Sequence, residues 1–171
     1  MISEGDRLPD ASLWTMTEDG PTARSTQELF GTRRVALFGV PGAFAPVCSA
    51  SHLPGFIART DDFKAAGADA VVCVAVNDPR VIAVWEKQSG AEGLIEFWGD
   101  GNLEFCRALG LENDATARSQ GTRSKRYSML IDNGIVKKLN VEDVPANAEK
   151  SGAETLLAQL RELSSSEPAS S

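Results

Sequence analysis

The sequence predicts an α/β fold in which a mixed central β-sheet is covered by helices on both faces. Three observations lead to this fold class. Apolar runs at residues 34–40 and 70–76 are rich in β-branched residues, as in strands that are buried on both faces. Segments with helical spacing alternate with these runs, which implies parallel pairing. Near the C-terminus two further runs flank Asp132, Asn133 and Gly134, a strong hairpin signal that adds antiparallel strands.

The segment before the second apolar run supplies a short helical turn, a strand and a longer helix. Residues 25–28, Ser-Thr-Gln-Glu, form a possible capping box that opens a single helical turn. The strand at 34–40 ends in Pro-Gly and enters a loop. A helix is expected over 47–60 with a kink at Pro54, because proline lacks the N–H that would bond the carbonyl of Ala50.

The later elements alternate, form the hairpin and close with a helix. They are a helix over 79–88, a strand over 94–98, a helix over 102–109, hairpin strands over 126–131 and 135–139, and a helix over 148–163. Pro79 occupies a permitted first-turn position, and Gly110 is placed to end its helix. The last helix has apolar residues at helical spacing along one face. Strands and helices in this order predict a thioredoxin-like fold built on the mixed sheet.

The length and composition fit one globular domain. The chain has 171 residues, of which 42% are hydrophobic and 24% are charged. We expect a single domain over 1–163. We expect a disordered tail over 164–171, because this serine-rich stretch has nothing to bury.

The charge and hydropathy patterns exclude several kinds of partner. The formal net charge is −7 and the sequence pI is about 4.8. Such a surface repels nucleic acid and anionic membranes, so neither is expected as a partner. No apolar run approaches the length of a membrane span, and the first residues lack the features of a signal peptide. We therefore expect a cytoplasmic protein.

The cysteines carry the main chemical question of this sequence. Cys48, Cys73 and Cys106 are an odd number at wide spacings, which is unlike a secreted framework of disulfides. In a reducing compartment a cysteine is an inert small hydrophobe, a metal ligand or a nucleophile.

Cys48 stands in the most informative place. A Pro-Gly loop leads from the first buried strand to Cys48, which is expected in the first turn of a helix at the carboxyl end of that strand. Free backbone N–H groups and the positive end of the helix dipole favour a thiolate there. Pro41 and Pro46 stiffen the loop. The alternative is that Cys48 only fills a gap behind the loop.

The run Pro-Gly-Ala-Phe-Ala-Pro-Val-Cys-Ser at 41–49, followed by His-Leu-Pro-Gly-Phe at 52–56, resembles the active-site segment of peroxiredoxins, a family of redoxins. It is most similar to the branch that holds the plant type-II enzymes and mammalian peroxiredoxin V. Segments at 76–79, 108–111 and 123–129 resemble the same branch in order and spacing, so the likeness covers most of residues 3–162. The resemblance implies a thioredoxin-like fold and a thiol peroxidase acting on hydrogen peroxide or small alkyl hydroperoxides, with no metal, haem or flavin.

The resemblance also implies roles for four residues. Cys48 would be the peroxidatic cysteine, whose thiolate attacks the O–O bond and becomes a sulfenic acid. Arg126 would face this thiolate, since a guanidinium stabilises it and donates to peroxide oxygens. Pro41 would shield the site from water, and the N–H groups of Val47 and Cys48 would polarise the peroxide. Without the family, Arg126 would be taken as a solvated charge at the end of a strand.

Ala45 departs from the family pattern, which places Thr or, less often, Ser three residues before the peroxidatic cysteine. That hydroxyl is understood to bind peroxide and thiolate together. A hydrogen bond to a charged group is worth about 1.5–3 kcal/mol, so its loss would slow the reaction roughly 10- to 150-fold. The departure keeps open an alternative from another class, a redox-sensing or interaction module with weak turnover.

Two further hypotheses concern the residues after Cys48. His52 lies four residues on, on the same helical face, and the pair could supply two zinc ligands. No cluster completes a tetrahedral set, so a local or subunit-interface hydrogen bond is expected for His52 instead. The Cys-Ser-Ala-Ser run at 48–51 resembles a monothiol motif, which would suit an oxidoreductase acting on protein or glutathione disulfides.

The other cysteines are expected to be structural. Cys73 sits mid-strand among valines, although it follows Cys48 by 25 residues, as the second cysteine of plant type-II peroxiredoxins does. A resolving role for Cys73 therefore stays open and would need backbone movement. Cys106 is expected to pack in a helix. The favoured cycle uses one cysteine and an external thiol, glutathione with glutaredoxin or thioredoxin. The family also implies a homodimer, with Phe44 and the Pro41 loop near the interface.

Overall fold

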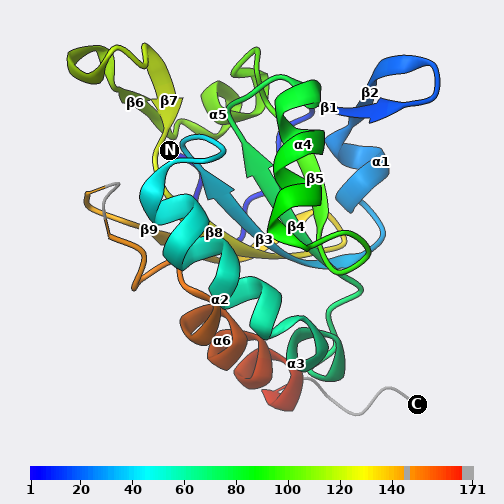
Figure 1. The fold of residues 1–171 in the computed structure, drawn as a ribbon. Coiled ribbons are helices and arrows are strands. Elements are labelled where there is room, and N and C mark those ends of the chain that lie inside the picture. Colours follow the sequence, from blue (N-terminus) through cyan, green and yellow to red (C-terminus); the bar gives the residue numbers. More distant parts are fainter. Residues whose placement is uncertain (145–146, 167–171) are drawn as a thin grey trace.

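A computed structural model describes residues 1–144 and 147–166. Within these residues seven strands form one sheet in the order β2-β1-β5-β4-β3-β8-β9, with β3 near its centre (Figure 1). The strands of this sheet are β1 Ser12–Thr17, β2 Gly20–Ser25, β3 Arg34–Val40, β4 Ala70–Ala75, β5 Glu96–Gly99, β8 Tyr127–Asp132 and β9 Ile135–Val141. The strands β6 Glu112–Asp114 and β7 Thr122–Ser124 pair in a small hairpin beside it.

The sheet is mixed, as predicted. Strands β3, β4 and β5 are parallel to one another, whereas β8 and β9 run antiparallel on the far side of β3. The antiparallel hairpin of β1 and β2 completes the other edge, where β1 meets β5 at Trp14 and Gly99. The thioredoxin-like fold class is thus confirmed.

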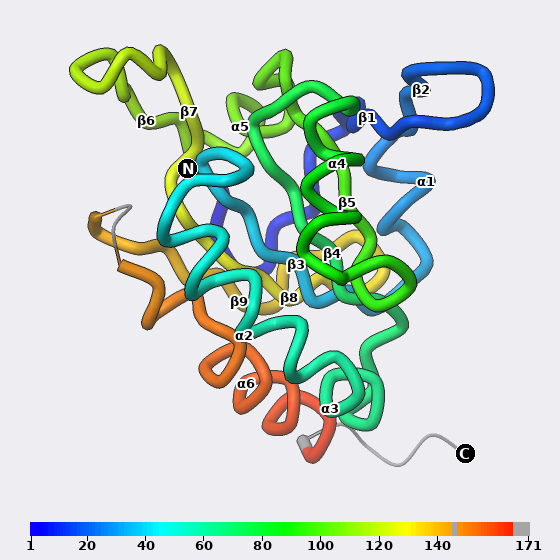
Figure 2. The backbone as a smooth tube through the Cα atoms, viewed as in Figure 1, coloured from blue at the N-terminus to red at the C-terminus, as the bar shows by residue number. Residues whose placement is uncertain are grey.

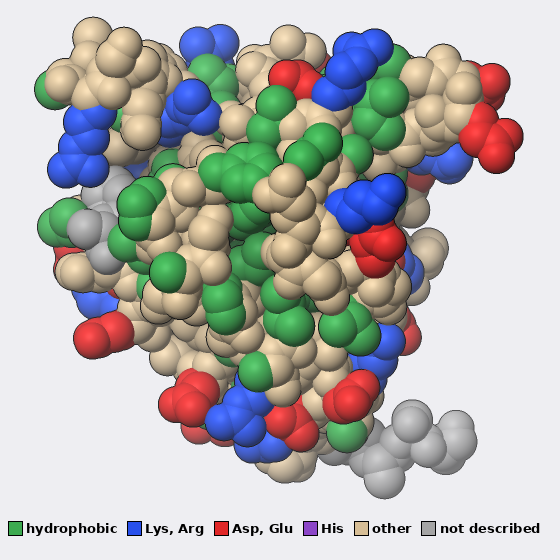
Figure 3. Space-filling view, viewed as in Figure 1, with side chains coloured by type: hydrophobic (Ala, Val, Ile, Leu, Met, Phe, Trp, Pro, Cys, Tyr) green, Lys and Arg blue, Asp and Glu red, His purple; other side chains and the backbone are tan. Residues whose placement is uncertain are grey.

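Helices cover both faces because side chains alternate along the central strands. In β3, Phe38 belongs to the core cluster on one face and Leu37 to the cluster on the other. The helices are α1 Thr26–Phe30, a π-helix Cys48–His52, α2 Leu53–Ala58, α3 Thr60–Ala65, α4 Pro79–Ser89, a 3₁₀ turn Thr116–Arg118, α5 Glu104–Leu109 and α6 Ala153–Ser166. The first face is covered by α2, α3, α4 and α6, and the second by α1 and α5 (Figure 2). Hydrophobic side chains also gather on the outer surface, between the region of α2 and that of α4 (Figure 3).

The segment expected as one helix over 47–60 is instead three pieces. A π-helix occupies Cys48–His52, α2 follows, and the chain breaks at Arg59, whose φ and ψ are −113° and 9°. The irregularities are the π-helix before Pro54 and the break at Arg59 after it, rather than Pro54 itself. Pro54 sits in the first turn of α2, where its missing N–H costs nothing.

The last helix also differs from the prediction. It begins at Ala153 rather than 148 and continues to Ser166, so the first three residues of the expected tail are helical. The hydroxyl of Ser164 donates to the carbonyl of Ala66 at 2.6 Å, which anchors this end of α6. The remainder of the expected tail, 167–171, lies outside the described residues.

The N-terminal hairpin was not predicted. Strand β2 has the sequence Gly-Pro-Thr-Ala-Arg-Ser and is largely exposed, so it carries no alternation of apolar residues. The small β6–β7 hairpin was not predicted either, because its strands are only three residues long and polar.

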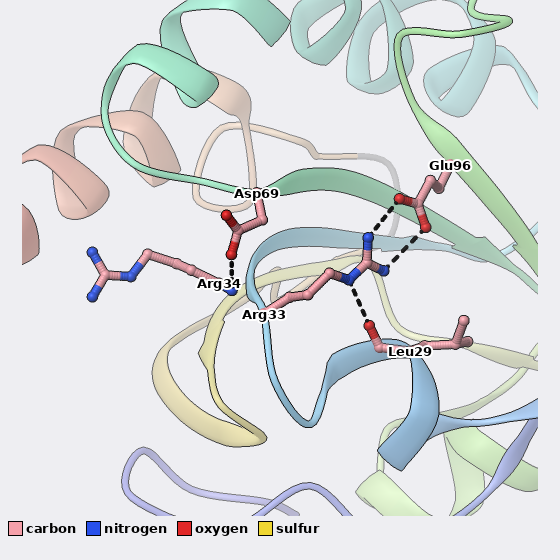
Figure 4. A network of polar contacts seen from close by, with 5 residues as sticks. All are labelled: Leu29, Arg33, Arg34, Asp69 and Glu96. Atoms are coloured by element: carbon pink, nitrogen blue, oxygen red, sulfur yellow. Dashed lines mark hydrogen bonds and ion pairs between the residues drawn. The ribbon is translucent and has the colours of Figure 1, made fainter.

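The amino ends of the parallel strands are tied by a polar network (Figure 4). Arg33 forms a fork with the Glu96 carboxylate at 2.8 and 3.2 Å and donates from Nε to the Leu29 carbonyl at 2.9 Å. The Arg34 N–H donates to Asp69 at 2.8 Å. Since Cys48 lies beyond the carboxyl end of β3, this network stabilises the opposite end of the sheet and is structural.

Candidate active site

The loop that carries Cys48 leaves the carboxyl end of β3. It is held by one residue that follows β4 and one from the β6–β7 hairpin. Asn77, which follows β4, accepts a hydrogen bond from the Ala43 N–H at 2.7 Å. Arg123 in β7 donates from Nη1 to the carbonyls of Val76 at 2.8 Å and Pro41 at 3.4 Å. These bonds fix the loop against the carboxyl ends of β3 and β4, the edge where parallel sheets place their sites.

The wide π-helical turn places Cys48 and His52 on the inner side of the helix. The Leu53 N–H bonds the carbonyl of Cys48, five residues back. Both side chains are buried, with relative exposures of 0% for Cys48 and 2% for His52. The turn therefore presents a thiol and an imidazole together to the core.

Arg126 completes this group from the start of β8. The Nη2 of Arg126 donates to the Sγ of Cys48 at 2.9 Å. Strand β8 pairs with β3 in antiparallel register, with Tyr127 opposite Gly39, and this pairing brings Arg126 to the end of β3. Arg126 is 2% exposed, so the alternative of a solvated strand-end charge is wrong. The guanidinium thus places a positive charge and a hydrogen-bond donor directly beside the sulfur.

His52 connects the Arg126 guanidinium to the backbone of Ser151. Its Nδ1 accepts from Nη1 of Arg126 at 3.0 Å, and its Nε2 lies 2.9 Å from the carbonyl of Ser151, to which it donates. Burial lowers the pKa of His52 to about 3, opposed by the hydrogen bond to Ser151 and assisted by the charge of Arg126. His52 is therefore a neutral imidazole protonated on Nε2, because only that tautomer satisfies both partners.

The geometry can be set beside known proteins. The family model of the redoxins matches residues 3–157. Mitochondrial peroxiredoxin-2F of Arabidopsis thaliana is 43% identical over 78% of this chain, which spans 66% of that relative's length. Chloroplastic peroxiredoxin-2E-2 of Oryza sativa subsp. japonica is 44% identical over 92% of this chain and 72% of its own. The chain belongs to the redoxin family and is a peroxiredoxin. A structure of reduced Prx3 from Vibrio vulnificus in complex with H₂O₂ superposes with a TM-score of 0.88 at 46% identity, covering 94% of this chain and 99% of that one.

The other two cysteines of this peroxiredoxin lie in different surroundings. Cys73, in the middle of β4, shares a core cluster with Cys48, and burial raises the pKa of its thiol, assisted by the nearby charge of Cys48. Cys106 lies in α5 on the opposite face of the sheet. Burial, and then the charge of Asp100, raise the pKa of Cys106 to about 12. Both thiols therefore stay protonated at neutral pH.

Three residues around Cys48 occupy the loop as expected from the sequence. Pro41 directly follows β3, and Val47 precedes the π-helix. Ala45 is half-buried and packs against the core cluster, so a methyl group stands where the family has a hydroxyl. Nearby, the hydroxyl of Ser49 accepts from Nε1 of Trp85 at 3.2 Å.

The described residues contain neither a group of metal ligands nor a helix that could span a membrane. Over residues 1–144 and 147–166, His, Cys, Asp and Glu side chains do not gather in groups that could hold a metal ion. In the same part of the chain, every helix is too short or too polar to cross a bilayer.

The sequence alone missed several contributors to the site. Arg123 and Asn77 lie in segments that resemble the family, yet no local pattern shows that they hold the Cys48 loop. Glu142 and Ser151 lie outside every motif that was singled out. His52 was expected to bond locally or at a subunit interface, and instead it joins Arg126 inside one chain.

The titration of His52 provides a direct test, because His52 is the only histidine in the sequence. We expect its imidazole proton signals in the folded protein to stay constant as the pH falls from about 8 to about 5, whereas in urea the group titrates near 6.5. Since the unfolded chain takes up this proton and the folded chain does not, the stability contributed by His52 is complete above 6.5 and is lost toward about 3. A folded-state midpoint near 6.5 in the NMR titration would contradict this environment.

Proposed function

We propose that Cys48 is the peroxidatic residue of a thiol-dependent peroxidase that reduces hydrogen peroxide and small alkyl hydroperoxides. The observation that carries the proposal is the contact of 2.9 Å between the buried Arg126 guanidinium and the Cys48 sulfur. A thiolate is the nucleophile in such chemistry, and an adjacent guanidinium favours it without ever losing its own proton.

The proposed reaction has two stages. The Cys48 thiolate attacks one peroxide oxygen, so that an S–O bond forms as the O–O bond breaks. The departing hydroxide or alkoxide takes up a proton and leaves as water or alcohol, and the sulfur is left as a sulfenic acid. Two external thiols then reduce the sulfenic acid, giving a disulfide and a second water.

The surroundings of Cys48 support the assigned roles. The N–H groups of Val47 and Cys48 lie in the first turn, where a helix has no internal acceptor for them, and they can donate to the peroxide. We assign Pro41 to shielding the thiolate from water, since the clamp by Arg123 holds this residue at the end of β3. The full burial of Cys48 favours small peroxides as substrates. Among the relatives, Prx3 of Vibrio vulnificus is described in complex with H₂O₂.

We propose a one-cysteine cycle that depends on an external reductant, either thioredoxin or glutathione with glutaredoxin. Cys73 could resolve the sulfenic acid only if β4 were distorted, because it lies mid-strand between its pairing partners Phe38 and Phe97. Cys106 is separated from Cys48 by the sheet.

Peroxide consumption tests both the activity and the reductant. The purified chain is incubated with hydrogen peroxide and, in parallel, with dithiothreitol, the thioredoxin system, or glutathione plus glutaredoxin. Catalytic loss of peroxide with dithiothreitol and with one physiological donor is expected. Sulfenylation of Cys48 without turnover under any donor would instead support the redox-sensing module, and disulfide exchange without peroxide loss would support the monothiol oxidoreductase.

We also propose a homodimer that buries the apolar surface beside the Cys48 loop. Phe44, in the loop before the π-helix, is 48% exposed, and Val84, on α4, is 49% exposed. Hydrophobic side chains gather on the surface between α2 and α4 (Figure 3). The Phe44 and Trp85 rings are 6.5 Å apart, which joins loop and helix into one surface. Light scattering of the parent and of Phe44→Glu tests this proposal, with a dimer and a monomer expected respectively.

The compartment is proposed to be the cytoplasm. The support is the set of three cysteines, free in the structure and odd in number, which suits a reducing environment. Relatives carry mitochondrial and chloroplastic names. Cell fractionation with an antibody against the chain tests the proposal, and the chain is expected in the cytoplasmic fraction.

Ala45→Thr tests whether the pocket lacks a hydroxyl. The added hydroxyl is expected to bond the peroxide oxygen more strongly in the transition state, where charge moves onto the departing oxygen, and so to raise the chemical rate. A gain of roughly 10- to 150-fold follows from about 1.5–3 kcal/mol. The measurement is stopped-flow oxidation of the reduced variant by hydrogen peroxide.

The matched control is Ala45→Val, which has the shape of threonine without the hydroxyl. Ala45→Val is expected to give no increase in the oxidation rate. Its melting temperature reports the stability lost by filling the space, commonly about 1–3 kcal/mol. If Ala45→Thr is no faster at unchanged melting temperature, another group already serves the peroxide.

A further inference from the structure

We infer that Glu142 is a positioning residue for the Cys48 site, acting through Ser151 and His52 on the guanidinium of Arg126. This inference rests on the proposed function, because it concerns the readiness of Cys48 to react. It assigns a role to a buried carboxylate that does not itself touch the reacting sulfur.

The four residues form a closed ring of hydrogen bonds. The Glu142 Oε2 accepts from both the N–H and the Oγ of Ser151, at 2.5 and 2.6 Å. The Ser151 carbonyl accepts from Nε2 of His52, and Nδ1 of His52 accepts from Arg126. The ring closes through the backbone, since the Glu142 N–H donates to the Arg126 carbonyl at 2.9 Å.

Every member of the ring is buried. The relative exposures are 5% for Glu142, 0% for Ser151, and 2% for both His52 and Arg126. A buried carboxylate is costly unless it is hydrogen-bonded, and here the backbone and side chain of one serine meet that need. Buried networks of this kind hold their members in one arrangement.

The ring has a chemical consequence at His52. The Ser151 carbonyl can only accept, so it requires the proton of the neutral imidazole to be on Nε2. The lone pair of Nδ1 is then directed at Arg126 Nη1, and the same guanidinium presents Nη2 to Cys48. Arg126, which can only donate, requires the same tautomer at Nδ1. By fixing where the Ser151 carbonyl points, Glu142 supports this tautomer from the Nε2 side and holds His52 against Arg126, so that both contacts of His52 loosen when Glu142 is removed.

Ser151 lies in the segment that connects β9 to α6. It follows β9 by a loop and stands two residues before α6 begins. On the outside of the same loop Lys150 forms an ion pair with Asp143 at 2.5 Å, with side-chain exposures of 58% and 81%. In the described part of this loop, Glu142 thus makes a buried carboxylate contact and its neighbour Asp143 an exposed one.

The buried contact of Glu142 and the exposed contact of Asp143 allow a matched experiment. Glu142→Ala removes the acceptor of Ser151. Glu142→Gln keeps an oxygen, and since both Ser151 bonds go to a single oxygen of Glu142, the amide can still accept them. Asp143→Asn weakens only the exposed ion pair. All are made in the full chain and kept reduced.

Two readouts are taken on each variant. Long-range ¹H–¹⁵N NMR of the single histidine reports which ring nitrogen carries the proton. Stopped-flow oxidation by hydrogen peroxide reports the second-order rate constant, and the melting temperature is measured beside it.

For Glu142→Ala we expect a mixture of His52 tautomers and a rate constant lower by about tenfold or more, equivalent to about 1.4 kcal/mol in the barrier. Glu142→Gln is expected to keep the Nε2–H tautomer and a rate within about twofold of the parent, and Asp143→Asn to match the parent in both. A folded Glu142→Ala with the parental tautomer and rate would overturn the inference, whatever its melting temperature.

If Glu142→Ala does not fold, Ser151→Ala takes its place, because it removes one of the two bonds to Glu142 and keeps the carbonyl that faces His52. Partial tautomer mixing with a smaller loss of rate is expected, and no change in either would overturn the inference. Should the parent chain itself fail to react with peroxide, the proposed function falls, while the NMR result still decides the role of Glu142.

Discussion

Cys48→Ser is expected to abolish reaction with peroxide. A serine hydroxyl stays protonated at neutral pH and is a far poorer nucleophile than a thiolate, so the O–O bond finds no attacking atom at this position. Loss of peroxide should fall to the rate of the buffer. The measurement is peroxide consumption under dithiothreitol, with circular dichroism to show that the variant is folded.

Cys73→Ser and Cys106→Ser are the matched controls for this substitution. Both thiols are buried and burial raises their pKa values, so neither supplies a thiolate at neutral pH. Each variant should still form a sulfenic acid on Cys48 and still turn over with an external thiol. Mass spectrometry that places the first oxidation on Cys73 or Cys106 would refute the assignment of Cys48.

Arg126→Met is expected to lower the rate constant for oxidation of Cys48 by at least about 100-fold. The substitution removes the donor at 2.9 Å from the sulfur together with the donor to the peroxide. Each hydrogen bond to a charged group is worth about 1.5–3 kcal/mol, so the loss of both exceeds two orders of magnitude. The measurement is stopped-flow oxidation of the reduced variant by hydrogen peroxide, with circular dichroism to show that the variant is folded.

Arg126→Lys separates charge from geometry. A lysine keeps the positive charge, but its single ammonium cannot bridge the Cys48 sulfur and His52 Nδ1 as the planar guanidinium does. We expect a rate between those of the parent and Arg126→Met. Parental rates in a folded Arg126→Met variant would show that this guanidinium does not assist the reaction.

Some elements could be predicted because their signals are local. Strand β3 begins and ends where the apolar run 34–40 does, and β4 matches its β-branched run within one residue. Helix α4 starts at Pro79 with Asp78 as its N-cap and ends at Ser89, followed by Gly90 as C-cap in the left-handed region. In each case the residues that determine the element lie within it or directly beside it.

Other elements depend on distant partners and could not be predicted. The apolar spacing that suggested a helix from 148 continues into real helix only at Ala153. Ser151 lies just ahead of that helix, where its N–H donates to Glu142 and its carbonyl accepts from His52. The start of α6 thus directly follows a segment whose hydrogen bonds go to residues distant in sequence, which apolar spacing does not report.

The sequence by itself determined the fold class and identified Cys48 as the candidate reactive cysteine. A Pro-Gly loop, a following helix start and Cys48 are contiguous, so their chemistry can be inferred from neighbours along the chain. Only the tertiary structure decided that Arg126 is buried against Cys48, 78 residues away, and that His52 bonds both Arg126 and Ser151, the latter 99 residues away. The physical reason is that these contacts arise from the antiparallel pairing of β8 with β3 and from the return of the chain after β9, which no local pattern encodes.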